Sequence, residues 1–344
     1  MSSQHTGKWE KRWHPLREEW VVYSAHRNNR PWSFDLKKLP SGKPAYDSGC
    51  YLCPGNRRSG GHVNPDYEDV FVFDNDFPVV GLEAPEIPLE NRSLHDGLFR
   101  RESARGIARV VCYAREHNLT LSEVSPERMT RVFEVWREEM IFFEKHPAIH
   151  SVLIFENKGE IVGVSNPNPH CQIYAVDFPL KLVEQEQAAA EKYRQRTGRN
   201  LFADIVEAEL KDSLRIVAEN DHAVAFVPFF ARYAYEVLIF PKKRHATLIT
   251  MEPEELRGIA AAYQEVIRRF DKVFEMSFPY VMNFHQAPVD GSSYPEYHLY
   301  VHFQPPLRQP GLPKYLAGPE IGAGNFMADT LPEEKAAELR NVRV

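Results

Sequence analysis

The stretch that decides the fold starts with the apolar run Arg109-Val-Val-Cys-Tyr113 and continues through His117-Asn-Leu-Thr-Leu121 to Ser125-Pro126-Glu127. The same order of features returns 128 residues after His117, in Val237-Leu-Ile-Phe240, His245-Ala-Thr-Leu248 and Glu252-Pro253-Glu254. Self-similarity at a fixed spacing is the signature of a repeated structural unit. The two stretches therefore predict a duplicated chain.

Each stretch predicts one long helix followed by two strands. Proline is favourable in the first helical turn, and apolar residues follow Pro126 and Pro253 at helical spacing. The strands expected after these helices are residues 152–155 and 170–174 in the first stretch and residues 280–284 and 298–302 in the second. Short strands with hairpin-like connections favour an α+β class with antiparallel sheets and packed helices over a doubly wound parallel sheet.

The repeat also suggests where the chain divides. We place one half at residues 1–190 and the other at residues 191–344. Residues 181–196 are rich in Glu, Gln and Ala and precede Gly198, so we expect a bridging helix that ends at this glycine.

Composition and charge narrow the function. Hydrophobic residues make up 43% of the 344, and no apolar run approaches the roughly 18 residues that span a bilayer. The net charge of −6 argues against duplex nucleic acid as a partner. Residues 1–60 hold 11 Lys and Arg against 5 Asp and Glu, which suits a small anionic ligand or a solvated surface. The polar N-terminus lacks a signal segment, so we expect a cytoplasmic protein that binds neither nucleic acid nor membrane.

Cys50 and Cys53 form a Cys-x-x-Cys pair. Four cysteines in 344 residues are too few for a secreted fold held by disulfides. The spacing is typical of a metal site, and it also occurs in redox pairs and inert loops. The pair alone leaves these three alternatives open.

The loop before His170 reads Ser165-Asn-Pro-Asn-Pro-His-Cys-Gln172. Its prolines exclude a helix, and strand alternation after the loop places His170, Gln172 and Tyr174 on one face. A neutral imidazole can attack phosphorus, and a nearby glutamine can donate a hydrogen bond to a phosphate oxygen. The alternative is a hydrogen-bonded structural histidine.

This loop resembles the active-site signature of galactose-1-phosphate uridylyltransferases, which are duplicated relatives of the histidine-triad fold. Other motifs of the family follow in the family's order: Arg27-Asn-Asn-Arg-Pro-Trp32, Cys50-Tyr-Leu-Cys53, Phe71-Val-Phe-Asp-Asn-Asp-Phe77, Glu156-Asn-Lys-Gly159, Phe284-His-Gln-Ala-Pro288 and Gly318-Pro-Glu320. The resemblance implies two tandem histidine-triad-like halves, with the nucleophile and a zinc site in the first and sugar-phosphate recognition in the second.

The resemblance also implies a ping-pong nucleotidyl transfer. His170 would attack the α-phosphorus of UDP-glucose, glucose 1-phosphate would leave, and the uridylyl group would pass to galactose 1-phosphate. Gln172 and Ser165 would hold the transferring phosphate. The implied substrate-binding residues are Arg27, Arg30, Asn75, Asn157, Gly163, Lys314 and Glu320. Family members are homodimers whose active sites can take residues from both subunits, so we expect a homodimer.

A structural zinc site is implied in the first half. Its ligands would be Cys50, Cys53 and His117, which suit zinc. Asn168 stands where the family has a fourth, histidine ligand, and an amide oxygen is a weaker ligand.

A second zinc or iron site is implied in the second half. Its ligands would be Glu186, His285 and His302. Tyr300 stands where a further histidine is expected, and His298 shares the predicted strand face and could substitute for it. The absence of a second metal is the alternative.

Two further departures from the family pattern concern the substrate. Pro319 precedes Glu320 where the family commonly has tyrosine, and the loss of a hydroxyl can redirect sugar specificity. Cys171 stands beside the nucleophile where glycine is usual. One alternative is therefore a related nucleotidyltransferase or phosphorylase with another nucleotide sugar or acceptor. The other is a non-catalytic nucleotide-binding protein.

Overall fold

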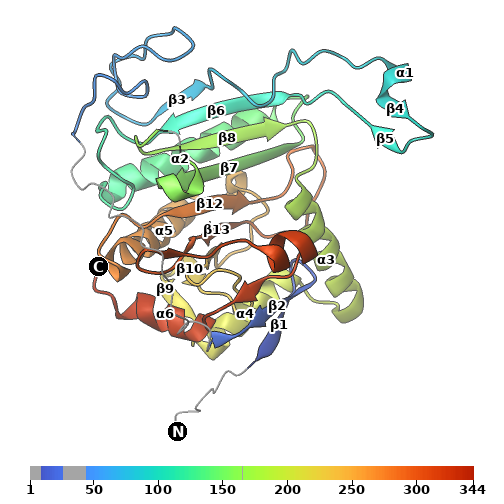
Figure 1. Ribbon diagram of the computed structural model, residues 1–344, viewed down its shortest axis with the longest axis vertical. Helices are drawn as coiled ribbons and strands as arrows, with labels where there is room; N and C mark the ends of the chain where they lie inside the picture. The colour runs from blue at the N-terminus through green and yellow to red at the C-terminus, as the bar shows by residue number, and fades with distance from the viewer. Residues whose placement is uncertain (1–8, 26–43, 165) are drawn as a thin grey trace.

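A nine-stranded sheet runs through the computed structural model, which describes residues 9–25, 44–164 and 166–344 (Figure 1). Its strands are β3 (Phe71–Asp74), β6 (Gly106–Cys112), β7 (Ser151–Lys158), β8 (His170–Val176), β9 (Ile216–Glu219), β10 (Ala223–Phe226), β11 (Val237–Pro241), β12 (Tyr280–His285) and β13 (Tyr300–Gln304). In space the order is β3-β6-β8-β7-β12-β13-β11-β10-β9, and all neighbours are antiparallel. The predicted antiparallel α+β class is confirmed.

The strand order repeats the duplication of the sequence. β6, β8 and β7 on one side of the sheet correspond to β11, β13 and β12 on the other, and β7 pairs with β12 at the centre. Each repeat has one long helix after its first strand, α2 (Pro126–Glu144) or α5 (Pro253–Val273). The two repeats therefore form one continuous sheet.

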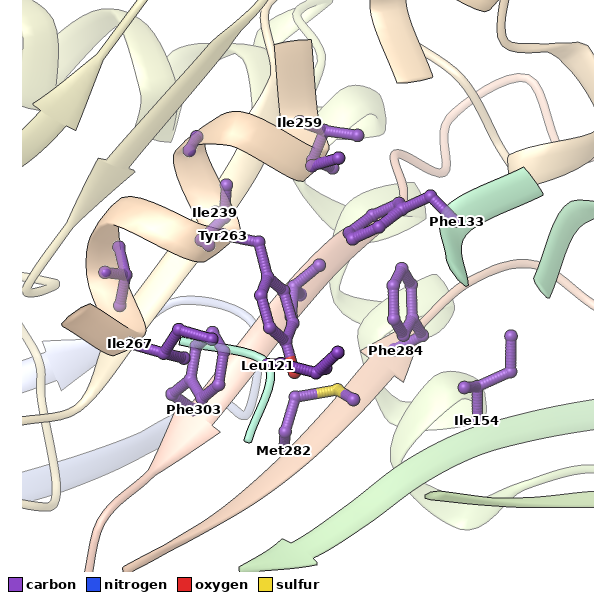
Figure 2. Packing of buried hydrophobic residues seen from close by; sticks show 14 of the residues in the cluster. Leu121, Phe133, Ile154, Ile239, Ile259, Tyr263, Ile267, Met282, Phe284 and Phe303 are labelled. Carbon is purple, nitrogen blue, oxygen red and sulfur yellow. The ribbon is translucent and has the colours of Figure 1, made fainter. Parts of the chain in front are cut away.

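α2 and α5 cover one face of this sheet. Each begins at its predicted proline, and the Ser125 hydroxyl before α2 accepts a hydrogen bond from the Arg128 amide at 3.2 Å. Figure 2 shows Phe133 of α2 and Tyr263 of α5 beside Phe284 of β12. The ring centre of Phe133 lies 5.6 Å from that of Tyr263 and 5.9 Å from that of Phe284. These three rings belong to the largest hydrophobic cluster among the described residues.

α3 (Lys181–Thr197) and α4 (Leu201–Asp212) cover the opposite face over the second repeat. Their apolar residues pack with Leu238 and Phe240 of β11, whereas Val237 and Ile239 of the same strand face α5. This division follows from strand alternation. The helix predicted over residues 181–196 is confirmed as α3, and it ends at Gly198, whose φ of +73° suits glycine.

The remaining elements surround the sheet. They are β1 (Glu10–His14), β2 (Glu19–Tyr23), α1 (Leu89–Arg92), β4 (Ser93–Leu94), β5 (Phe99–Arg100), β14 (Leu307–Gln309), β15 (Leu312–Pro313), β16 (Met327–Ala328), α6 (Pro332–Asn341) and the short turns η2 (Glu160–Val162), η3 (Leu248–Thr250) and η4 (Gly318–Gly322). β1, β2 and β16 form a small sheet of their own. Among the described residues, no helix has the length and apolarity that a membrane crossing requires.

Candidate active site and metal centre

His170 is the first residue of β8 and follows the proline-stiffened loop. Its Nδ1 lies 2.7 Å from the carbonyl oxygen of Asn168. Nδ1 therefore carries the proton and donates it to this carbonyl, which makes Nε2 the basic nitrogen. Burial lowers the pKa of His170, against the opposing effect of this hydrogen bond. The ring is therefore neutral near pH 7, with a nucleophilic lone pair on Nε2.

Gln172 lies on the same face of β8 as His170. The buried residues Cys171 and Ile173 face the α2–α5 side, whereas His170, Gln172 and Tyr174 are partly exposed on the other face. The Tyr174 hydroxyl donates to Gln172 Oε1 at 3.3 Å. With this oxygen already paired, the amide NH₂ of Gln172 is its donor toward an anion.

The neighbouring strand brings Asn157 to the same face. Phe155 of β7 is paired with Gln172, and Asn157 lies two residues farther along β7. Gly163 closes the turn η2 with a φ of +83°, a conformation that favours glycine.

Asn75 lies two strands away from β8, directly after β3. Its backbone N–H donates to the carbonyl of Ala108, which is paired with Tyr174. Asn75 is therefore level with Tyr174, about 13 Å along the strand from His170. Its side-chain oxygen accepts from the Phe77 amide at 2.9 Å.

Three predicted zinc ligands converge beside the loop that leads to His170. The ligand atoms of Cys50, Cys53 and His117 all lie within 4.8 Å of one another, and the three residues are buried. Asn168 joins them, because its Nδ2 lies 3.6 Å from Cys50 Sγ, 3.5 Å from Cys53 Sγ and 3.3 Å from His117 Nδ1. The structure thus brings together all four predicted residues.

The donor set of this cluster fits a zinc ion. Asn168 is 1% exposed, and its Oδ1 is buried without a hydrogen-bond partner. A half-turn of the amide would direct this oxygen toward the two sulfurs and the imidazole. Two thiolates, one imidazole nitrogen and one amide oxygen can complete a tetrahedral zinc site.

The predicted second metal site has a different geometry. Glu186, His285 and His302 lie together, but they do not form a group whose ligand atoms all lie within 4.8 Å of one another. Within residues 9–25, 44–164 and 166–344, Cys50, Cys53 and His117 are the only such group of three or more His, Cys, Asp or Glu residues. The residues of the second site therefore do not fit a metal ion as they are placed.

His298 is not brought to Glu186. Its Nε2 lies 3.0 Å from the carbonyl oxygen of Pro241, and its Nδ1 lies 3.3 Å from that of His245. The physical reason is that β13 begins at Tyr300, so strand alternation does not extend back to residue 298.

Lys314 and Glu320 are paired with each other, far from His170 of the same chain. Their Nζ and Oε1 atoms lie 3.0 Å apart. Phe326, which contacts Lys314 and Arg232, places this pair near the start of β11. β11 is four strands away from β8, which corresponds to about 19 Å across the sheet. The other predicted site residues, Arg27, Arg30 and Ser165, lie outside the described residues.

Sequence reasoning missed Asn166 and Glu236. Asn166 is buried beside Cys50, and its Oδ1 accepts from the Asn168 backbone amide at 2.9 Å. In the sequence, only its position in the loop before His170 indicated that Asn166 belongs to the site. Glu236 is buried beside His302, and the signal was a carboxylate directly before the apolar run of β11.

Comparison with known proteins places the chain in a family. Residues 2–179 match the model of the galactose-1-phosphate uridyl transferase N-terminal domain, and residues 186–344 match that of the C-terminal domain. The galactose-1-phosphate uridylyltransferase of Haemophilus influenzae is 37% identical over 96% of this chain and 93% of its own length. The galactose-1-phosphate uridylyltransferase of Saccharomyces cerevisiae is 34% identical over 96% of this chain and 94% of its own length.

Solved structures share the architecture. A uridylyltransferase structure has a TM-score of 0.77 at 29% identity, covering 96% of this chain and 97% of its own. An Arabidopsis thaliana ADP-glucose phosphorylase with bound ADP-glucose shares the fold, with a TM-score of 0.77 at 21% identity over 98% of this chain and 100% of its own. Two adjoining family models and relatives above 30% identity over nearly the full length lead to one conclusion: the chain belongs to the galactose-1-phosphate uridyl transferase family.

Proposed function

We propose that the protein transfers the uridylyl group of UDP-glucose to galactose 1-phosphate through a covalent uridylyl-His170 intermediate. The observation that carries this proposal is the 2.7 Å hydrogen bond from His170 Nδ1 to the Asn168 carbonyl, which leaves Nε2 as the nucleophile. Relatives at 33–37% identity are named galactose-1-phosphate uridylyltransferases, which supports uridylyl transfer to galactose 1-phosphate by this chain.

The transfer takes two displacements at one phosphorus atom. His170 Nε2 attacks the α-phosphorus of UDP-glucose, an N–P bond forms, and the bond to the glucose 1-phosphate oxygen breaks. The phosphate oxygen of galactose 1-phosphate then attacks the same phosphorus, and the N–P bond breaks. Through both steps the Nδ1–H group of His170 remains hydrogen-bonded to the Asn168 carbonyl. The amide NH₂ of Gln172 donates to the phosphoryl oxygens.

The metal centre would help to hold His170 in place through Asn168. Cys50, Cys53, His117 and Asn168 would hold a zinc ion, whose role is structural. Asn168 contributes its side chain to this centre and its backbone carbonyl to His170. Fixing the side chain therefore fixes the carbonyl that orients the nucleophile.

We also infer a homodimer in which Lys314 and Glu320 serve the site of the partner subunit. Their lateral separation from β8 within one chain, about 19 Å, supports this division. The segment between β3 and β6, which carries α1, β4 and β5, projects from the sheet (Figure 1). Its Leu89 and Leu98 are 78% and 74% exposed, which is typical of a surface that another subunit covers.

A cytoplasmic location is part of the same proposal. All four cysteines are free and buried, and reduced thiols are typical of that compartment.

Intact mass spectrometry tests the chemistry directly. The purified protein is mixed with UDP-glucose and should gain the mass of one uridylyl group, and galactose 1-phosphate should remove it. The matched control, His170→Asn, should gain nothing. A parallel sample with ADP-glucose tests the alternative nucleotide. If the wild-type protein forms no adduct with UDP-glucose, the proposed reaction is wrong.

A further inference from the structure

Two buried carboxylates and two imidazoles form a linear hydrogen-bonded chain between α3 and the sheet. His285 Nδ1 lies 2.9 Å from Glu186 Oε1, and His285 Nε2 lies 3.4 Å from His302 Nδ1. His302 Nε2 lies 2.9 Å from Glu236 Oε1. Glu186 is 1% exposed and Glu236 is 0% exposed, so both carboxylates depend on protein partners.

Two tyrosine hydroxyls complete the pairing of Glu186. Tyr300 OH donates to Oε1 at 2.7 Å, and Tyr297 OH donates to Oε2 at 2.6 Å. The ring of Tyr300 also stacks on His285, with 4.5 Å between ring centres. Glu186 thus accepts three hydrogen bonds, one on Oε1 from Tyr300 and two on Oε2 from Tyr297 and His285.

Glu236, at the other end of this row of hydrogen bonds, also has its own partners. Glu236 Oε2 accepts the backbone amides of Arg232 at 2.7 Å and Tyr233 at 3.0 Å, just before β11. Each imidazole can donate one proton to its carboxylate, and the hydrogen bond between the two facing nitrogens requires a second proton on one of the rings. Both buried carboxylates are thus satisfied without a metal ion.

A metal ion requires lone pairs that converge on one point. Here each imidazole lies between two partners, with its two nitrogens directed to opposite sides. Tyr300 directs a hydroxyl proton, not a lone pair, toward Glu186. The pairing therefore uses the groups that a metal would need.

We propose that this protein has a metal-free clamp, formed by Glu186, Tyr297, Tyr300, His285, His302 and Glu236, in place of a second metal site. Glu186 lies on α3, the helix that follows the nucleophile strand β8, whereas its partners lie on or beside β12 and β13. The clamp thus fastens α3 to the second repeat. Tyr300 is the residue that excludes the metal.

The metal content of the full-length protein tests the clamp. After incubation with excess Zn²⁺ or Fe²⁺ and desalting, elemental analysis should find at most one metal ion per wild-type chain. Cys50→Ser/Cys53→Ser should remove it, whereas Glu186→Gln should leave it in place. A second ion per wild-type chain that Glu186→Gln removes would overturn the proposal. If the cysteine variant fails to fold, the comparison of metal content between the wild type and Glu186→Gln still tests the proposal.

Substitutions at Tyr300 test its role. Tyr300→Phe should lower the melting temperature by a few degrees without any gain of metal, because Glu186 loses one donor. Tyr300→His should gain a second ion, because a ring nitrogen replaces the hydroxyl. Tyr297→Phe is the matched control and should lower the melting temperature alone. If Tyr300→His folds and stays at one ion, Tyr300 does not exclude the metal. These counts are independent of uridylyl transfer, so they stand or fall separately from the proposed reaction.

Discussion

At the scale of single residues, Asn168 connects the proposed metal centre with His170. Its side chain reaches Cys50, Cys53 and His117, and its backbone carbonyl orients His170. An amide is a weaker zinc ligand than imidazole, so position 168 should set how firmly the metal is held.

We expect Asn168→Ala to weaken zinc retention by about tenfold or more, and Asn168→His to strengthen it, since a change of this kind near a metal costs about 10–100-fold in affinity. Zinc release to a chelating dye measures both effects. Asn166→Ala removes a side chain that contacts Cys50 and the Asn168 amide without being a ligand, so it measures the part of the loss that comes from positioning the ligands. Equal release from all three variants would contradict a ligand role for Asn168.

Gln172 offers a second prediction at this scale. Gln172→Ala should reduce kcat by about 100-fold or more, because it removes a donor to the charge that develops on the phosphoryl group. Steady-state uridylyl transfer measures the loss. Tyr174→Phe removes only the hydroxyl that pairs with Gln172 Oε1, so its effect should be much smaller. An unchanged kcat in Gln172→Ala would exclude Gln172 from the transfer.

At the scale of elements, strand β7 carries different kinds of side chain on its two faces. Asn157 lies on the site face, whereas Glu156 points into the core between the sheet and the helices. The hydroxyls of Tyr113 and Tyr263 lie 3.0 and 3.3 Å from Glu156 Oε2. Burial raises the pKa of Glu156 to about 7.

This pKa predicts a dependence of stability on pH. The unfolded carboxyl ionises near 4.5, but the folded one keeps its proton up to about pH 7. The contribution of Glu156 to the free energy of unfolding should therefore fall between these pH values by about 3 kcal/mol and then level off. Glu156→Gln cannot ionise, so it should match the wild type near pH 4 and exceed it at pH 8. Urea denaturation at both pH values measures the difference, and parallel curves for the two proteins would contradict the assignment.

The whole molecule divides the proposed site between distant regions. His170 lies in the first repeat, and the Lys314–Glu320 pair lies near the start of β11. A homodimer with shared sites predicts that two inactive variants complement each other.

We expect His170→Asn and Glu320→Ala to be weakly active alone and to regain activity when the subunits are mixed and reassociated. A random mixture contains mixed dimers with one intact site each, so about a quarter of all sites recover. The control replaces Glu320→Ala with the double variant His170→Asn/Glu320→Ala, which restores no site. Activity no greater than the sum of the separate variants would show that each chain builds its own site.

The sequence by itself determined the repeat, the main helices and the faces of the site strands. α2, α3 and α5 begin at the predicted positions because proline and helical spacing act among near neighbours. The alternation of His170, Gln172 and Tyr174 is equally local. The family motifs added candidate ligands and substrate-binding residues, although Arg27, Arg30 and Ser165 lie outside the described residues.

Only the tertiary structure decided how residues distant in the sequence meet. It joined the repeats through β7 and β12, brought Asn168 to Cys53, and placed His298 away from Glu186. It also turned the expected metal ligands Glu186, His285 and His302 into a hydrogen-bonded chain. The physical reason is that a ligand set depends on where ring nitrogens and oxygens point after packing. Residue order alone does not fix those directions.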